Sequence, residues 1–253
     1  MVHAGDGLID ENITAADTDA DPGVKLWKFC RDSQMVEWDW ATGMPDIQRL
    51  SPVRSPASSA LSRHIPVQGY SQVTGASLDF ESGLEFELML TLDRLPTTRH
   101  LVSQPFRLTW LDGVWHVPDL LSVDSEGEVT VWDARAEDRQ DDRFLSVSQR
   151  TARACADVGW HFQVFPGLSS RASLNLRWLS GARRRPEWLS TTKDLVRSVV
   201  QDGAVIGDVM DGDDSGRHLT ASMWHLMWTG QIAVDLNERW TRNTSISWHE
   251  ATN

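Results

Sequence analysis

The sequence predicts an α/β fold, in which a mixed β-sheet is flanked by helices and followed by a small, mainly helical C-terminal domain. Three observations predict it. Leucines at helical spacing follow Ser82, strand-like runs separated by turn residues occupy 101–135, and a second helical repeat precedes another strand-like run at 160–165. Because strand, helix and strand connect as a right-handed crossover, the last two strands should lie parallel in one sheet.

The first helix is predicted to begin after Ser82, a residue type that caps helix N-termini, and to end near Pro96. Its apolar repeat consists of Leu84, Leu88, Leu92 and Leu95. Gly159 stands where the C-terminal cap of a second helix belongs. One face of that second helix is marked by Phe144, Val147, Thr151, Ala154 and Val158.

Three antiparallel strands are predicted between these two helices. The runs 101–110 and 114–123 flank Asp112-Gly113, a dipeptide typical of tight hairpin turns. A third run, 128–135, follows a second turn rich in small and acidic residues. The expected order is therefore a helix, three antiparallel strands, a helix and a parallel strand.

Composition divides the chain into three predicted regions. Residues 1–24 are polar and acidic, which predicts a disordered tail. Residues 25–185 are expected to form the α/β domain, although 25–80 shows no strong periodicity. Residues 186–253 are expected to form a small domain that binds a partner or DNA.

The C-terminal domain is predicted to contain helices at 188–200 and 219–229 and a short strand at 231–236. Four large apolar residues crowd the second of these helices: Trp224, Leu226, Met227 and Trp228. A helix that is apolar on all sides is either central and buried, or it presents one face to a partner.

The formal net charge of −12 in 253 residues argues against a protein that coats nucleic acid by electrostatics alone. It leaves a nuclease open, because carboxylates that hold a divalent cation add negative charge at the site. Arginines gather at positions 171, 177 and 183–185, a cluster that a solvated face also explains.

The chain shows no membrane or secretion signal. No stretch approaches the roughly 18 apolar residues that a membrane span needs, and the acidic N-terminus lacks the pattern of a signal peptide. We therefore expect a cytoplasmic protein without a membrane partner. Cys30 and Cys155 are far apart and indicate reduced thiols rather than a disulfide framework or a zinc site.

The candidate chemistry lies in the hairpin between 116 and 135. If the hairpin is symmetric about Glu126, Asp119 lies opposite Asp133 on one face of the sheet. The same symmetry pairs Leu121 with Val131 and Val123 with Val129. Opposed carboxylates repel each other unless a cation lies between them, and oxygen ligands favour Mg²⁺ or Mn²⁺. Arg135 follows on the same face and is suited to orient a phosphate.

Two simpler interpretations stay open. The hairpin could be exposed, with both aspartates pointing into water. Glu85, on the preceding helix, is a candidate third carboxylate, but Ser82-Gly83-Leu84-Glu85 also reads as a capping box, in which Glu85 binds the Ser82 amide. On the residues alone, the capping box is the better explanation of Glu85.

Pro118-Asp119 followed by Asp133-Ala134-Arg135 matches the signature of the PD-(D/E)xK nucleases, a pattern that also arises by chance. Seven runs in order, between about residue 65 and residue 240, resemble the TnsA-like endonuclease subunits of bacterial heteromeric transposases. They are Asp79–Glu85, Ser103–Phe106, His116–Asp119, Trp132–Arg135, Cys155–Trp160, Asn175–Leu179 and Trp224–Gly230.

This resemblance implies a restriction-endonuclease-like core with a winged-helix-like C-terminal domain, and Mg²⁺-dependent cleavage of DNA at transposon ends. It implies an integrase-like transposase subunit as partner, and an AAA+ ATPase regulator as a further one. The family's carboxylates fall on Glu85, Asp119 and Asp133, and its basic residue falls on Arg135. Gln104 and His116 match further recurrent positions of the family more loosely.

Arg135 departs from the usual lysine of the family. Arginine stays protonated in proteins, so it can hold a phosphate or a water molecule but cannot act as a general base. Three functions therefore remain open: a transposase-associated nuclease, a catalytically weak module that recruits partners, and a stand-alone restriction or repair nuclease.

Overall fold

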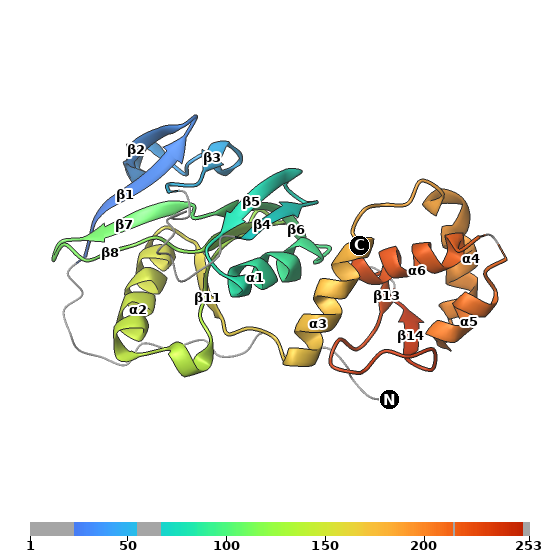
Figure 1. Ribbon diagram of the computed structural model, residues 1–253. Coiled ribbons are helices and arrows are strands. Elements are labelled where there is room, and N and C mark those ends of the chain that lie inside the picture. The colour runs from blue at the N-terminus through green and yellow to red at the C-terminus, as the bar shows by residue number, and fades with distance from the viewer. Residues whose placement is uncertain (1–22, 55–66, 215, 250–253) are drawn as a thin grey trace.

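A computed structural model describes residues 23–54, 67–214 and 216–249. These residues form a mixed α/β structure, as the sequence predicts, although they contain four β-sheets rather than one, together with six α-helices (Figure 1). The predicted tail lies outside the described residues, except for its last two positions. Val24 belongs to the first strand, so the predicted boundary after residue 24 falls inside an element.

The central sheet has the strand order β11-β10-β9-β6. Its strands are β6 (Thr98–Ser103), β9 (Leu120–Asp124), β10 (Val129–Ala134) and β11 (His161–Phe165). β10 runs antiparallel to β9 and parallel to β11, which confirms the predicted crossover. The predicted register is also confirmed, because Leu121 pairs with Val131 and Val123 pairs with Val129.

The helices α1 (Gly83–Asp93) and α2 (Asp142–Asp157) pack on the central sheet. Ser82 caps α1 as predicted, because its side-chain oxygen accepts a hydrogen bond from the Glu85 amide. Gly159, with a φ of 78°, follows α2 where the cap was expected. Leu88 and Leu92 of the predicted repeat are buried in α1, but Leu95 lies beyond the end of the helix and is 44% exposed, which corrects that part of the prediction. Met89 and Leu90 are also buried, so the leucine repeat marks only part of the buried surface of α1.

The two long strands predicted at 101–110 and 114–123 are each divided in two, which corrects that expectation. β6 and β9 stay in the central sheet, whereas β7 (Phe106–Trp110) and β8 (Trp115–His116) pair in a second sheet. The breaks fall at Pro105 and Pro118, which lack the amide proton that a strand ladder needs. Gln104, with a φ of 46°, turns the chain at the first break.

The second sheet has the order β2-β1-β7-β8, with β3 paired to β1. Its N-terminal strands are β1 (Val24–Arg31), β2 (Gln34–Trp38) and β3 (Leu50–Ser51), and a separate hairpin consists of β4 (Val67–Ser71) and β5 (Ala76–Phe80). None of these strands was predicted. Trp27 and Phe29 alternate inward from β1 and pack with Phe106 and Trp160, so aromatic alternation was the missed signal.

The C-terminal part, after residue 185, contains three helices and a small sheet of order β12-β14-β13. Its elements are α4 (Leu189–Val200), β12 (Ala204–Val205), α5 (Ile206–Asp211), α6 (His218–Trp228), β13 (Ile232–Ala233) and β14 (Ser245–Trp248). The two predicted helices correspond to α4 and α6. The predicted strand at 231–236 shrinks to β13, and α5, β12 and β14 were not predicted.

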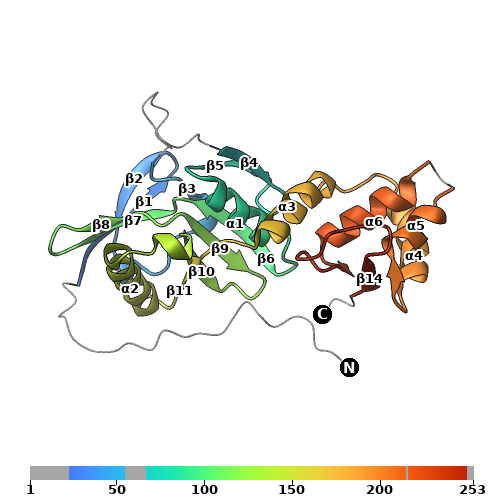
Figure 2. The same ribbon diagram turned by 60° about the horizontal axis from the view of Figure 1, so that its bottom comes forward.

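Helix α3 (Ser170–Leu179) lies between α1 and α6 and contacts both (Figures 1 and 2). One apolar cluster includes residues on both sides of the expected boundary at 185, among them Leu90, Leu176, Val196 and Leu226. The remaining elements are short 3₁₀ helices at Trp40–Thr42, Ile47–Arg49, Glu137–Arg139 and Ser180–Ala182. Within the described ranges, no helix combines the length and the apolar character needed to cross a bilayer.

Candidate functional site

Asp119 and Asp133 lie at the same end of neighbouring strands. The Asp119 amide donates to the Trp132 carbonyl at 3.0 Å, which continues the β9–β10 ladder by one position. Asp133 is 2% exposed and follows Val129 and Val131 on the buried face of β10. The expected juxtaposition therefore exists, and the exposed-hairpin interpretation is wrong for Asp133.

Asp119 is held in a setting that disfavours its ionised form. Burial raises its pKa well above the ordinary value, and the neighbouring carboxylates of Asp133 and Glu85 raise it further. The Ala134 amide donates to its Oδ2 atom at 2.7 Å, which acts in the opposite direction. Repulsion from both acids shows that the three carboxyl groups are close enough to interact electrostatically.

His116 is the direct partner of Asp133. Its Nε2 atom lies 3.0 Å and 2.9 Å from the two carboxylate oxygens. Both distances are within hydrogen-bonding range, so one ring nitrogen contacts both oxygens of the carboxylate. His116 belongs to β8, and the break at Pro118 lets the hairpin bend so that this side chain reaches β10.

Glu85 stands at the N-terminus of α1. Its Oε2 atom accepts a hydrogen bond from the Glu81 amide at 2.8 Å, and its Oε1 atom accepts one from the Ser82 hydroxyl, also at 2.8 Å. Glu85 therefore caps the helix as predicted, but its carboxylate accepts from the backbone amide of Glu81 rather than from that of Ser82. Burial raises the pKa of Glu85, and these hydrogen bonds lower it in part.

Glu81, Gln104 and Arg54 form a polar network beside Glu85. Gln104 Nε2 donates to Glu81 Oε1 at 3.2 Å, and Arg54 forms an ion pair with Glu81 Oε2 at 3.1 Å. The negative charge of Glu81 contributes to the raised pKa of both Glu85 and Asp119. Sequence reasoning singled out Gln104 but missed Glu81 and Arg54, since Arg54 comes from a segment without periodicity.

Arg135 is oriented away from the carboxylates in this structure. Its Nε atom donates to the Arg139 carbonyl at 2.7 Å, and its guanidinium lies 5.5 Å from the ring centroid of Phe144. No ion pair among the described residues joins Arg135 to Asp119 or Asp133. The backbone places Arg135 directly after β10, but its side chain must change rotamer before it can face a ligand at the carboxylates.

Other buried acids of the chain differ from this group. Asp93 accepts hydrogen bonds from the Ser71 hydroxyl and from the amides of Gln72 and Val73, at 2.6–3.1 Å. Such a carboxylate is satisfied by donors and caps local structure. For Asp119, in contrast, burial raises the pKa most, and three other carboxylates (Asp133, Glu85 and Glu81) raise it further, an arrangement that costs stability and is typical of functional sites.

The donor set suits a hard divalent cation. In the part of the chain that the structure describes, no three His, Cys, Asp or Glu side chains converge closely enough to hold a metal ion. Mg²⁺, however, is commonly held by one or two carboxylates, with water and phosphate oxygens completing its shell. Asp119 and Asp133 supply such a pair, and a cation would offset their mutual repulsion.

No protein-family model matches this chain, and no curated protein gives a significant match to it.

Proposed function

We propose that this protein is a metal-dependent DNA endonuclease that cleaves transposon ends together with a separate transposase subunit. The observation that carries the proposal is the carboxylate pair Asp119–Asp133 at the ends of paired strands, where the Asp119 amide donates to the Trp132 carbonyl at 3.0 Å and so extends the register of β9 and β10. Opposed carboxylates that raise a neighbour's pKa are costly in a fold and are explained by a bound cation.

In this proposal Asp119 and Asp133 hold Mg²⁺ or Mn²⁺. Glu85 is the third carboxylate of the proposed site, but it must move closer to the pair before it can reach the cation. The bound cation would supply charge stabilisation at the scissile phosphate. His116 orients the Asp133 carboxylate through Nε2. Arg135 follows Asp133 by two residues. Once its side chain is released from the Arg139 carbonyl, its guanidinium would bind an oxygen of the phosphate.

The arrangement of elements supports a restriction-endonuclease-like core and a winged-helix-like C-terminal domain. The order helix, strand, helix, helix, strand, strand from α4 to β14, with the first and last of its strands paired, resembles a winged helix. In the proposal this part serves contacts with DNA, an integrase-like transposase subunit or an AAA+ ATPase, in the cytoplasm.

The experiment is a cleavage assay on duplex DNA that carries the transposon ends of the protein's own element. It is run with Mg²⁺ or Mn²⁺, with and without the transposase subunit, for wild type, Asp119→Asn and Asp133→Asn. Both variants should lose cleavage by at least about 100-fold. Asp79→Asn is the matched control, since Asp79 is an exposed aspartate of β5 whose substitution should leave cleavage unchanged.

A second candidate is a catalytically weak module that recruits the transposase. The orientation of Arg135 away from the carboxylates favours it. This second candidate predicts that the chain does not cleave DNA, either alone or mixed with the transposase subunit, although the transposase subunit still binds the chain. A stand-alone restriction or repair nuclease would instead cleave without the partner and on DNA that lacks transposon ends.

A further inference from the structure

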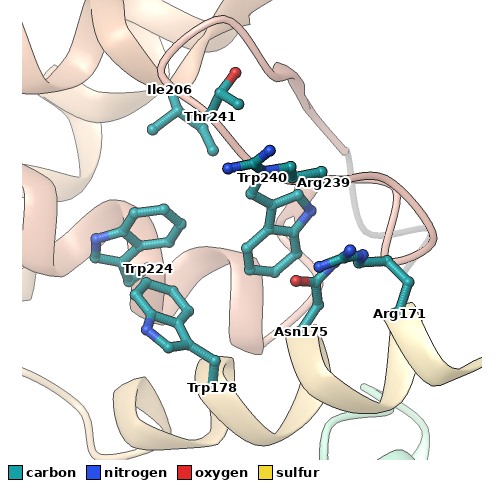
Figure 3. Close-up of a pocket in the computed structure, with 8 residues that line it drawn as sticks. All are labelled: Arg171, Asn175, Trp178, Ile206, Trp224, Arg239, Trp240 and Thr241. Atoms are coloured by element: carbon teal, nitrogen blue, oxygen red, sulfur yellow. The ribbon is translucent and has the colours of Figure 1, made fainter.

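An open cavity of about 390 Å³ lies between α3 and the C-terminal part of the chain, and none of the three carboxylates of the candidate site lines it (Figure 3). Three tryptophans line it: Trp178 from α3, Trp224 from α6 and Trp240 from the loop before β14. The cavity volume falls within the range of small-ligand sites. Trp178 is 57% exposed, which is unusual for the largest apolar side chain.

The three indoles meet at two orientations. The rings of Trp224 and Trp240 are inclined by only 20°, with centroids 6.1 Å apart. Trp178 stands almost at right angles to both, at 80° and 83°, with centroid distances of 4.6 Å and 5.9 Å. A planar ring that stacks on Trp178 would therefore lie nearly perpendicular to the other two rings, which is the relative inclination of an edge-to-face aromatic pair.

The loop that carries Trp240 is fixed against α3 before any ligand arrives. Asn175 Nδ2 donates to the carbonyls of Leu236 and Glu238, at 2.7 Å and 2.8 Å. Trp240 Nε1 donates to the Asp235 carbonyl at 2.7 Å, which sets the plane of its ring. A preformed aromatic site loses little conformational entropy when it binds a ligand.

Two arginines give the cavity a positive rim in a chain of net charge −12. Arg171 on α3 and Arg239 in the loop both line the cavity, and both are exposed. Within the described residues neither guanidinium forms an ion pair with a carboxylate. Exposed Glu238 adjoins Arg239, but its backbone carbonyl rather than its carboxylate binds Asn175. Two cations disfavour a methylated ammonium ligand and favour an anionic one.

We propose that this cavity binds one nucleotide of single-stranded DNA, with its base stacked on the exposed ring of Trp178 and its flanking phosphates bound by Arg171 and Arg239. Aromatic surfaces beside basic side chains are how proteins hold single strands without reading their sequence. That the bound strand is DNA rests on the proposed function. The cavity itself offers an aromatic ring for a base and guanidinium groups for a phosphate.

The cavity is linked to the candidate site through α3. The guanidinium of Arg177 donates to the Gly83 carbonyl at 3.2 Å, two residues before Glu85. Trp178, the next residue of α3, lines the cavity. The helix that lines the cavity therefore also packs against α1, the helix that carries Glu85.

The test measures fluorescence anisotropy of a labelled oligodeoxythymidylate, in EDTA so that no cleavage takes place. Trp178→Ala should weaken binding by about 10-fold, as loss of one stacked base does, and Trp178→Phe should recover most of it. Arg171→Gln should lower the slope of log affinity against log salt by about 0.7, the value for one lost phosphate contact. A 2-aminopurine base should be quenched by wild type but not by Trp178→Ala.

Two controls match these variants. Leu174→Ala removes another exposed apolar side chain, 60% exposed, from α3 without altering the cavity lining. Arg49→Gln removes one exposed positive charge from the N-terminal sheet region. Neither should change the affinity for the oligonucleotide or its salt dependence by more than about 2-fold.

The inference is overturned if Trp178→Ala and Arg171→Gln bind the oligonucleotide as wild type does. It is also overturned if free thymidine monophosphate competes as well as the oligonucleotide, or if only peptides bind in a Trp178-dependent manner. These results are independent of Mg²⁺-dependent cleavage, so the proposed function can fail while this inference stands, and the reverse.

Discussion

Among single residues, Asp119 is the most strongly perturbed in the candidate site. Burial and the charges of Asp133 and Glu85 raise its pKa, and the amide of Ala134 is the only hydrogen-bond donor to it found within the described residues. Ionisation of Asp119 at neutral pH therefore destabilises the folded protein. That cost disappears when the acid is neutralised, either by a proton or by a cation.

Replacing Asp119 with asparagine should stabilise the metal-free protein at neutral and alkaline pH. A raised pKa means that the folded protein retains a proton that the unfolded chain releases above about pH 4, so stability falls as pH rises through the folded-state pKa. Asp119→Asn keeps an acceptor for the Ala134 amide and removes this fall. Thermal melting in EDTA should show a gain of about 1–3 kcal/mol near pH 8, shrinking towards pH 4. Parallel pH profiles for the two proteins would contradict it.

His116 should stabilise the fold by satisfying Asp133. The side chains are 21% and 3% exposed, so His116→Ala leaves a buried carboxylate without its partner. The free energy of unfolding should drop by about 1–3 kcal/mol, measured by urea denaturation. His161→Ala is the control, because His161 is 64% exposed and its ion pair with Glu128 spans 3.5 Å. An equal effect of both substitutions would show that His116 does not support Asp133.

Arg135 should act through its positive charge at the phosphate. Arg135→Lys keeps the charge and should retain most cleavage, whereas Arg135→Ala should lose about 100-fold in rate. Arg139→Ala removes a nearby exposed charge but keeps the carbonyl that Arg135 binds, so it should cleave as wild type does. If Arg135→Ala cleaves at the wild-type rate in the presence of the transposase subunit, Arg135 has no role in the reaction.

At the scale of elements, the bent hairpin decides what meets at the candidate site. The pairing of β9 with β10 could be predicted, because alternation and one turn fix the register. The contact between His116 and Asp133 could not, since it depends on how the chain bends at Pro118 and passes into another sheet. Glu81 and Arg54 were missed for the same reason, because their proximity comes from packing between distant segments.

The apolar residues of helix α6 allowed two interpretations, a buried central helix or a helix with one face open to a partner. Met223, Leu226 and Met227 are fully buried and Trp228 is 2% exposed, so this helix is central rather than an open docking face. Only Trp224 reaches the cavity described above. The N-terminal strands were not predicted for a different reason, because short runs with alternating aromatic residues give only a weak periodic signal.

Trp228 should contribute far more to stability than Trp224. Trp228→Ala empties a fully enclosed site in the main core and should cost about 3–5 kcal/mol. Trp224→Ala removes a half-buried side chain at the edge of an open cavity and should cost clearly less. Chemical denaturation measures both. Equal losses would mean that α6 is not packed as described.

At the scale of the whole molecule, one apolar cluster joins α1, α3 and the C-terminal helices. Arg94, at the end of α1, adds a polar link, because its guanidinium donates to the Met227 carbonyl at 3.1 Å. The element that bears Glu85 and the helices after residue 185 are thus parts of one packed body. For the proposed function, a chain of net charge −12 would need a divalent cation, arginines and a partner subunit to offset its repulsion of DNA phosphates.

The most direct test of the central claim is a crystal structure of the protein soaked in Mn²⁺, with anomalous scattering used to locate the metal. The proposed site predicts a peak between Asp119 and Asp133, with carboxylate oxygens within about 2.0–2.3 Å of the ion. Asp133→Asn crystals should lose that peak. A structure at saturating Mn²⁺ with no peak there, and with Asp133 still bound only to His116, would contradict the assignment of this protein as a metal-dependent nuclease.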